Sequence, residues 1–423
     1  MRSRLTSTAA NSMPVQAAVL AAAAAAALAL GACGAGDAPP SDAVVERDSA
    51  GIRIVENRAP AWTAGEAWRL ADRPSLDIGA PDGPPEQQLF RVTGAVRLSD
   101  GRIVVANGGT RELKFYDAAG SHLRTVGGEG GGPGEFDNLS WLGRTRSDTL
   151  LVWDNGARRL STFDPAGEFV SSVQAGADLS GFLALIVGVF DDGSMILRPG
   201  ESAATFMGRP TGELRDTVAL VRFDRSGAPM DTVGRFAGPE RFVFQRESGF
   251  SLADVFFGRE TFTALRGDRL FVADSDRYEV AAYDAAGELR ALVRRTHEPV
   301  AVRSDDVEAV RDAILAGIEG EEQRRRREEV LAEAPSRETL PAIGDLVVDR
   351  ASRIWLEAYR APGVDERRWS VFDADGRWLG SLEMPVGLDV LEIGESYVLG
   401  VERDAFDVEY VRLYEVVAGE DGA

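Results

Sequence analysis

The sequence predicts an all-β protein, a six-bladed β-propeller whose blades are four-stranded antiparallel sheets. Three observations lead to this prediction. A phrase made of an aromatic residue, an acidic residue, two further residues and a glycine recurs along the chain. A turn and a β-rich run precede each copy, and further short apolar runs flank them. Each repeat therefore supplies four strands, and such regular repetition favours a propeller over a sandwich or a jelly roll.

The recurring phrase is expected to form a hairpin corner. The aromatic residue ends a strand on its buried face, the aspartate accepts hydrogen bonds from the backbone that follows, and the glycine adopts the positive φ that reverses the chain. Five copies occur at residues 116–120, 163–167, 223–227, 283–287 and 372–376, with a degenerate sixth at residues 414–415.

The β-rich runs before these corners are the second strands of the repeats. They occupy residues 100–106, 148–153, 192–197, 268–273, 352–356 and 395–399. The last repeat has no clear fourth strand, whereas residues 75–79 resemble a fourth strand without its first three. Pairing these two ends of the chain would close the ring, so we expect the propeller to span residues 49–418.

A helical insertion is expected between the fourth and fifth blades, at about residues 303–335. Apolar residues recur there at helical spacing, and Pro335 ends the pattern. The segments 200–216 and 236–251 are interpreted as extra loops between the third and fourth corners.

The first 32 residues have the three parts of a secretory signal peptide: early arginines, a short apolar run and small residues before Cys33. Residues 30–33 resemble the lipobox of bacterial lipoproteins, which implies cleavage before Cys33 and lipid attachment to it. An ordinary signal peptide with an incidental cysteine is the alternative. Residues 33–48 are expected to be a flexible tether. Since Gly34 rather than aspartate follows the cysteine, the outer membrane is the predicted location, facing the periplasm or the exterior.

Composition excludes several classes of function. Removing Arg2 and Arg4 with the signal peptide leaves 45 basic against 68 acidic residues, a net charge of −23 in place of −21. Nucleic acids and anionic lipid surfaces would repel such a chain, so we expect membrane contact only through the lipid. One cysteine permits no internal disulfide, and two histidines leave little room for a histidine-based metal site.

Residues 126–163 resemble the NHL-repeat family of propellers. The similarity includes a glycine-rich crossing that ends at Phe136, a strand that ends in Asp154, and Arg158 before the corner. The strand at residues 354–356 and the closing segment 408–414 are similar to bacterial six-bladed propeller lipoproteins of the broader TolB-like and NHL group. The resemblance implies the fold and says little about function, because propellers include binding modules, hydrolases, lyases and scaffolds.

Polar residues at the ends of the second strands are the candidate ligand-binding site. They are expected to gather near the centre of one face, where carboxylates would suit Ca²⁺, a cationic ligand or a sugar. In the alternative interpretation each acid caps its turn and pairs with a nearby arginine. The candidates are Asn107, Asp154, Asp274 and Glu357, together with Arg111 and Arg158.

The sequence therefore favours a monomeric, lipid-anchored extracytoplasmic module that binds a protein, peptide or glycan, without a catalytic residue, bound metal or cofactor. The competing hypothesis is a metal-dependent, lactonase-like hydrolase that uses the acidic ring. The chain contains no Gly-x-Ser-x-Gly nucleophile motif, and His122 and His297 lie away from the predicted inner strands. Which ligand or partner is bound does not follow from the sequence.

Overall fold

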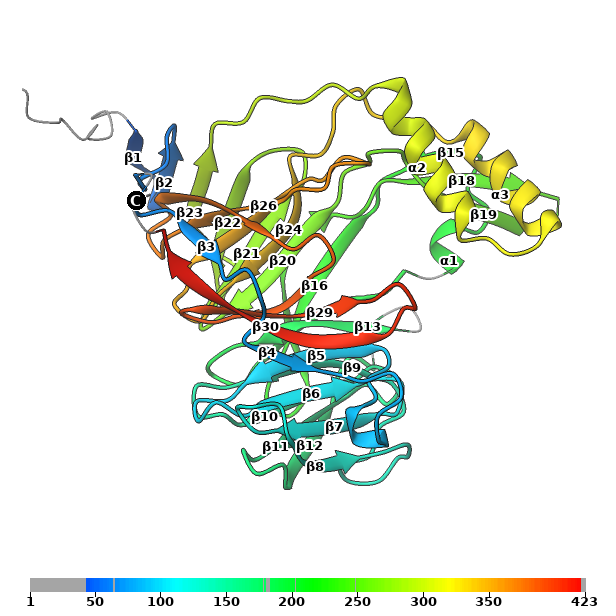
Figure 1. Cartoon of the computed structure of the whole chain (residues 1–423). Helices are drawn as coiled ribbons and strands as arrows, with labels where there is room; N and C mark the ends of the chain where they lie inside the picture. Colours follow the sequence, from blue (N-terminus) through cyan, green and yellow to red (C-terminus); the bar gives the residue numbers. More distant parts are fainter. Residues whose placement is uncertain are drawn as a thin grey trace, which may run out of the picture. The chain divides into compact units, whose positions relative to one another are not determined.

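The structure is a computed structural model that describes residues 43–419 except residues 64, 178, 180–182, 202 and 248. The predicted signal peptide and Cys33 lie outside the described residues. The described chain is mainly β, and several of its sheets are antiparallel and four-stranded (Figure 1). Such sheets, formed one after another along the chain, are the arrangement of a β-propeller.

Sheets I to III follow one another along the first half of the chain. Sheet I contains β5 (Val92–Arg97), β6 (Ile103–Asn107), β7 (Glu112–Tyr116) and β8 (His122–Gly127). Sheet II contains β9 (Leu139–Arg144), β10 (Leu150–Asp154), β11 (Arg159–Phe163) and β12 (Phe169–Gln174). Sheet III contains β13 (Ala184–Val189), β14 (Met195–Pro199), β16 (Thr217–Phe223) and β17 (Pro229–Ala237).

Sheets IV to VI complete the series. Sheet IV contains β20 (Thr261–Arg266), β21 (Arg269–Asp274), β22 (Glu279–Asp284) and β23 (Leu289–Arg295), extended by β2 (Ile52–Asn57) and β1 (Val44–Ser49). Sheet V contains β24 (Ile343–Val348), β25 (Ile354–Ala358), β26 (Arg367–Phe372) and β27 (Trp378–Met384). Sheet VI contains β28 (Asp389–Ile393), β29 (Tyr397–Arg403) and β30 (Glu409–Ala418) with the short strands β3 (Trp68–Leu70) and β4 (Leu76–Ile78).

The five hairpin corners have the geometry expected from their sequence. In the first, Asp117 Oδ1 accepts hydrogen bonds from the backbone N–H groups of Ala119 at 2.9 Å and Ser121 at 2.8 Å, and Gly120 has a φ of 85°. The other four corners repeat these bonds. Residues 414–415, expected to form a sixth corner, instead continue β30, because the strands that follow in sheet VI come from the other end of the chain.

Strands from the N-terminal and C-terminal parts of the described chain pair in sheet VI. β4 pairs with β30, placing Ile78 opposite Val411, and β3 pairs with the end of the same strand. This is the pairing expected for residues 75–79.

The predicted tether extends too far along the chain. Residues 44–48 lie in β1, which forms a hairpin with β2 through Ala50 and Gly51, both at positive φ. β2 in turn pairs in parallel with β23. The polar composition of this segment is typical of an exposed edge strand as well as of a tether. Composition alone therefore could not locate the boundary between the tether and the first strand.

The segments interpreted as loops between sheets III and IV contain regular structure. They form α1 (Ala203–Phe206) and a three-stranded sheet of β15 (Gly212–Leu214), β18 (Arg241–Arg246) and β19 (Gly249–Asp254). The loop prediction was wrong because β15 finds its partner in β18, about thirty residues further along the chain.

Two helices, α2 (Ser304–Ala316) and α3 (Glu321–Glu333), lie between β23 and β24, and a short 3-10 helix covers Pro85–Gln87. The helices pack against the three-stranded sheet through an apolar cluster that includes Ala253, Phe256, Leu315 and Val330 (Figure 1). Within the described part of the chain, no helix combines the length and the apolar character needed to cross a membrane.

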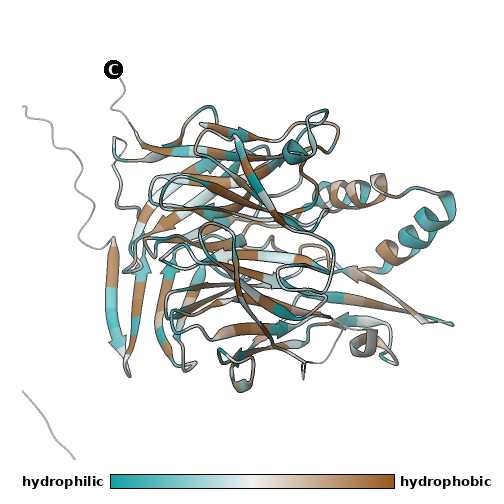
Figure 2. Ribbon diagram, turned by 90° about the horizontal axis from the view of Figure 1, so that it is seen from below, coloured by the Kyte–Doolittle hydropathy of each residue, from teal (hydrophilic) through white to brown (hydrophobic). Residues whose placement is uncertain are grey.

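Six apolar clusters hold the sheets together, and each joins two of them. They pair sheet I with II, II with III, III with IV, IV with V, V with VI, and VI with I. Figure 2 shows the hydrophobic residues concentrated along these strands. Burial of apolar surface between neighbouring sheets is the main source of stability for the described chain.

Candidate functional site

The structure places the predicted ligand-binding residues at equivalent points of their sheets. Asn107, Asp154 and Asp274 are the last residues of β6, β10 and β21, and Glu357 is the last but one of β25. Each of these side chains forms hydrogen bonds or an ion pair within the protein.

Asn107 and Asp154 are fully buried and hold turns together. The Asn107 side chain accepts a hydrogen bond from the Phe90 N–H at 2.7 Å and donates one to Thr110 at 2.8 Å. Asp154 accepts four backbone N–H groups at 2.8–3.0 Å, those of residues 137, 138, 156 and 157. Because the oxygens of these side chains are already used, neither is available as a ligand without loss of its turn.

Asp274 and Glu357 each form an ion pair with an arginine. Arg215 lies 2.6 Å from Asp274, and Arg367 contacts both carboxylate oxygens of Glu357 at 2.6 and 2.9 Å. The two candidate arginines also have partners within the protein. Arg111 pairs with Glu129 at 2.7 Å, and Arg158 donates to the Gly176 carbonyl at 2.5 Å.

Among the residues the structure describes, no three His, Cys, Asp or Glu side chains are placed to hold a metal ion. The donor set expected for Ca²⁺ therefore does not match a calcium site, which needs six to eight converging oxygens. The observed contacts agree with the alternative interpretation, in which the acidic side chains cap turns and form ion pairs.

A cavity of about 1110 Å³ lies elsewhere, and the first strands of all six sheets contribute to its wall. These strands are β5, β9, β13, β20, β24 and β28. The cavity continues between sheets II and III, where Leu151, Thr162 and Ser172 face Met195 and Ser226. The lining therefore includes more residues of sheets II and III than of the other sheets.

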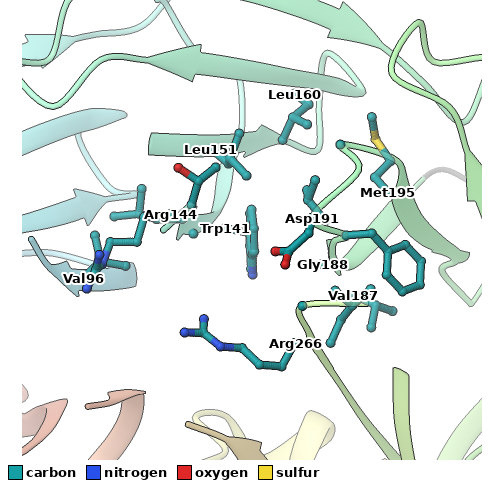
Figure 3. A pocket seen from close by; sticks show the side chains of 18 of the residues that line it. Val96, Trp141, Arg144, Leu151, Leu160, Val187, Gly188, Asp191, Met195 and Arg266 are labelled. Atoms are coloured by element: carbon teal, nitrogen blue, oxygen red, sulfur yellow. The ribbon is translucent and has the colours of Figure 1, made fainter. Parts of the chain in front are cut away.

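One wall of the cavity is apolar. Figure 3 shows Trp141, Leu151, Leu160 and Met195 around one side, with Arg266 entering from the other. The four apolar side chains come from sheets II and III and border the part of the cavity between these two sheets. The cavity can accept a ligand with a sizeable apolar part.

The charged residues of the lining are mainly basic. Five arginines border the cavity against two carboxylates, in a chain that carries 68 acidic and 47 basic residues overall. The arginines are Arg144, Arg146, Arg225, Arg266 and Arg350, and the carboxylates are Asp191 and Glu392.

Glu392 is the most deeply buried acid of this lining. It accepts hydrogen bonds from the Arg97 N–H at 2.8 Å and the Tyr397 hydroxyl at 3.0 Å, and lies 3.5 Å from Arg144. Burial raises the pKa of Glu392, and the neighbouring Arg144 opposes this shift without cancelling it. Arg144 is itself buried, with 4% of its side chain exposed, and also pairs with Asp148.

Arg266 has fewer partners. Its guanidinium donates to the Arg350 carbonyl at 3.5 Å and forms no ion pair with any carboxylate of the described residues. Burial lowers the pKa of Arg266, and the charge of Glu392 partly offsets this effect. At any physiological pH the group remains a cation, because the ordinary pKa of an arginine lies far above that range.

The sequence contained a signal for this basic cluster. Arg144 and Arg266 are each the last residue of the first strand in their sheet, the position that Arg97 holds in sheet I outside the cavity lining. The predicted site residues stand at the ends of the second strands, at the opposite end of the same hairpins, so these arginines were not among them.

Comparison with known proteins gives no family. No protein-family model matches the chain, and no curated protein matches it. Solved structures are similar at low identity. A member of the DUF4221 family from Bacteroides vulgatus has 11% identity and a TM-score of 0.49, covering 84% of this chain and 99% of its own.

Two further structures are similar in the same way. Virginiamycin B lyase from Staphylococcus aureus has 7% identity and a TM-score of 0.39, covering 83% of this chain and 100% of its own. Regucalcin, a calcium-binding protein from Agrobacterium tumefaciens, has 13% identity and a TM-score of 0.38, covering 84% and 97%. Because these TM-scores are below 0.5, the fold is assigned from the strand pairing described above.

Proposed function

We propose that this protein is a lipid-anchored, extracytoplasmic binding protein whose ligand enters the cavity between the first strands of the six sheets. The cavity carries the proposal. It combines an apolar wall with a small number of charged groups, as ligand-binding sites do, and its volume of about 1110 Å³ suits a small molecule or part of a peptide or glycan.

We further propose that the six sheets are the blades of one closed propeller. The six apolar clusters support this, because they join the sheets in cyclic order and the last cluster unites sheet VI with sheet I. The strand pairing of β4 with β30 supports it as well, since strands from both chain ends then share one blade.

The anchor and the location rest on the sequence. A signal peptide that ends in a lipobox-like segment before the only cysteine supports lipid attachment at Cys33 and export from the cytoplasm. In this proposal the outer membrane holds the lipid.

Binding is favoured over metal-dependent hydrolysis by the contacts of the acidic side chains. A lactonase of the proposed type would need carboxylates that converge on one ion, whereas Asp154 and Glu357 are committed to backbone N–H groups and to Arg367. The cavity arginines instead offer fixed donors to a ligand.

A neutral fluorescent probe tests the proposed site. N-phenyl-1-naphthylamine, an apolar dye, is expected to bind the wild-type chain, and Thr162→Trp is expected to weaken this binding about tenfold or more, because the indole occupies ligand space. Binding is measured by fluorescence titration of the mature chain carrying Cys33→Ser.

Thr217→Trp is the matched control, since it makes the same change at an exposed strand residue outside the cavity lining. Equal affinities of both variants and the wild type would contradict the cavity as the binding site.

A further inference from the structure

The cavity reverses the charge of the protein that surrounds it. The chain as a whole has a net charge of −21, yet five arginines and two carboxylates line the cavity. A basic interior within an acidic protein attracts an anion locally while the outer surface repels polyanions such as nucleic acid. The inversion therefore indicates a small anionic ligand.

The protein's own carboxylates leave part of this positive charge unbalanced. Asp191 lies 3.5 Å from Arg146, and Glu392 lies 3.5 Å from Arg144 while accepting hydrogen bonds from Arg97 and Tyr397. Among the described residues, Arg225, Arg266 and Arg350 form no ion pair with a carboxylate, and Arg225 donates to the Asp192 backbone carbonyl. Three guanidinium groups thus border the same space without a carboxylate partner.

Arg266 is the best placed of the three for a ligand. Figure 3 shows its side chain extending into the cavity, toward the side where Arg144 lies. Its guanidinium carries five N–H groups in a planar fork, and the long contact to the Arg350 carbonyl occupies only one of them. A carboxylate or sulfonate fits this fork with two parallel hydrogen bonds.

We propose that the ligand is an amphipathic organic anion, an inference that rests on the proposed function. Its carboxylate or sulfonate binds Arg266, and its apolar part packs against Trp141, Leu151 and Leu160. Arg144 lies on the same side of the cavity, held in place by its ion pairs with Asp148 and Glu392. The opening between sheets II and III accommodates the apolar body.

Two probes that differ by one anionic group test this proposal. 1-Anilinonaphthalene-8-sulfonate has the skeleton of N-phenyl-1-naphthylamine with an added sulfonate. For Arg266→Met we expect the affinity for the sulfonate probe to fall about 10- to 100-fold, the loss typical of a hydrogen-bonded charge pair. The affinity for the neutral probe should change by less than about twofold, which also shows that the variant is folded.

Arg146→Met is the matched control. It removes the same charge from the cavity lining, but 83% of the Arg146 side chain is exposed and its ion pair with Asp191 is long. We expect a change of less than about threefold for either probe.

The possible results separate the two proposals. If Thr162→Trp blocks the neutral probe but the sulfonate probe does not bind, or if Arg266→Met affects both probes equally or neither, the anionic ligand is excluded and the binding site stands. If the neutral probe binds with the same affinity to Thr162→Trp and to the wild type, the cavity is not the site and both proposals fail.

Discussion

Asp154→Ala is expected to lower the free energy of unfolding by about 3–5 kcal/mol, because four backbone N–H groups lose their acceptor at a fully buried position. Urea denaturation followed by tryptophan fluorescence measures the change. The midpoint should fall, with the slope of the transition unchanged.

Asp164→Ala provides the control within the same sheet. Asp164 accepts two backbone N–H groups, at 2.9 and 2.8 Å, in an exposed hairpin corner, so we expect a loss of only about 1 kcal/mol. If Asp154→Ala is no more destabilising than Asp164→Ala, the Asp154 carboxylate does not serve the turn and becomes available as a ligand again.

Cys33→Ser is expected to move the protein from the membrane fraction to the soluble periplasmic fraction. Each methylene buried in a bilayer contributes about 0.8 kcal/mol, so the loss of the acyl chains removes essentially all membrane affinity from a chain of this acidity. Fractionation with immunoblotting measures the distribution, and mass spectrometry measures the lipid on the N-terminal peptide.

Gly34→Ser leaves the cysteine in place and should remain in the membrane fraction. Membrane retention of Cys33→Ser at the wild-type level would show that the segment before residue 33 is not a lipobox and that the chain reaches the membrane in another way.

The repeated corners were predictable because their chemistry is local. An aspartate that bonds to the backbone two and four residues later, with a glycine at positive φ, needs no information from the rest of the fold. The same locality explains the prediction of helical structure near residues 303–335, where α2 and α3 lie.

The elements that the sequence missed depend on distant partners. β1 pairs with β2, and β2 is held in place by β23, more than two hundred residues away. Residues 44–48 contain no local pattern that would predict this pairing. β15 likewise forms only against β18. Non-local pairing of short polar strands is therefore where local patterns fail.

The role of the candidate site residues could not be decided from the sequence for a related reason. An acidic residue at the end of a strand looks the same in the sequence whether its oxygens bind a ligand or cap a turn. Only the structure shows that the oxygens of Asp154 accept hydrogen bonds from backbone N–H groups and that Arg367 donates to both carboxylate oxygens of Glu357. Two arginines of the cavity lining, Arg144 and Arg266, do stand at one repeat position, the last residue of the first strand.

A crystal structure of the mature chain with 1-anilinonaphthalene-8-sulfonate tests the central claim most directly. The account predicts six blades around the cavity and density for the probe inside it, with the sulfonate within hydrogen-bond distance of Arg266 and the rings against Trp141 and Leu151. Density for the probe only on the outer surface, with the cavity empty at a saturating concentration, would contradict the account.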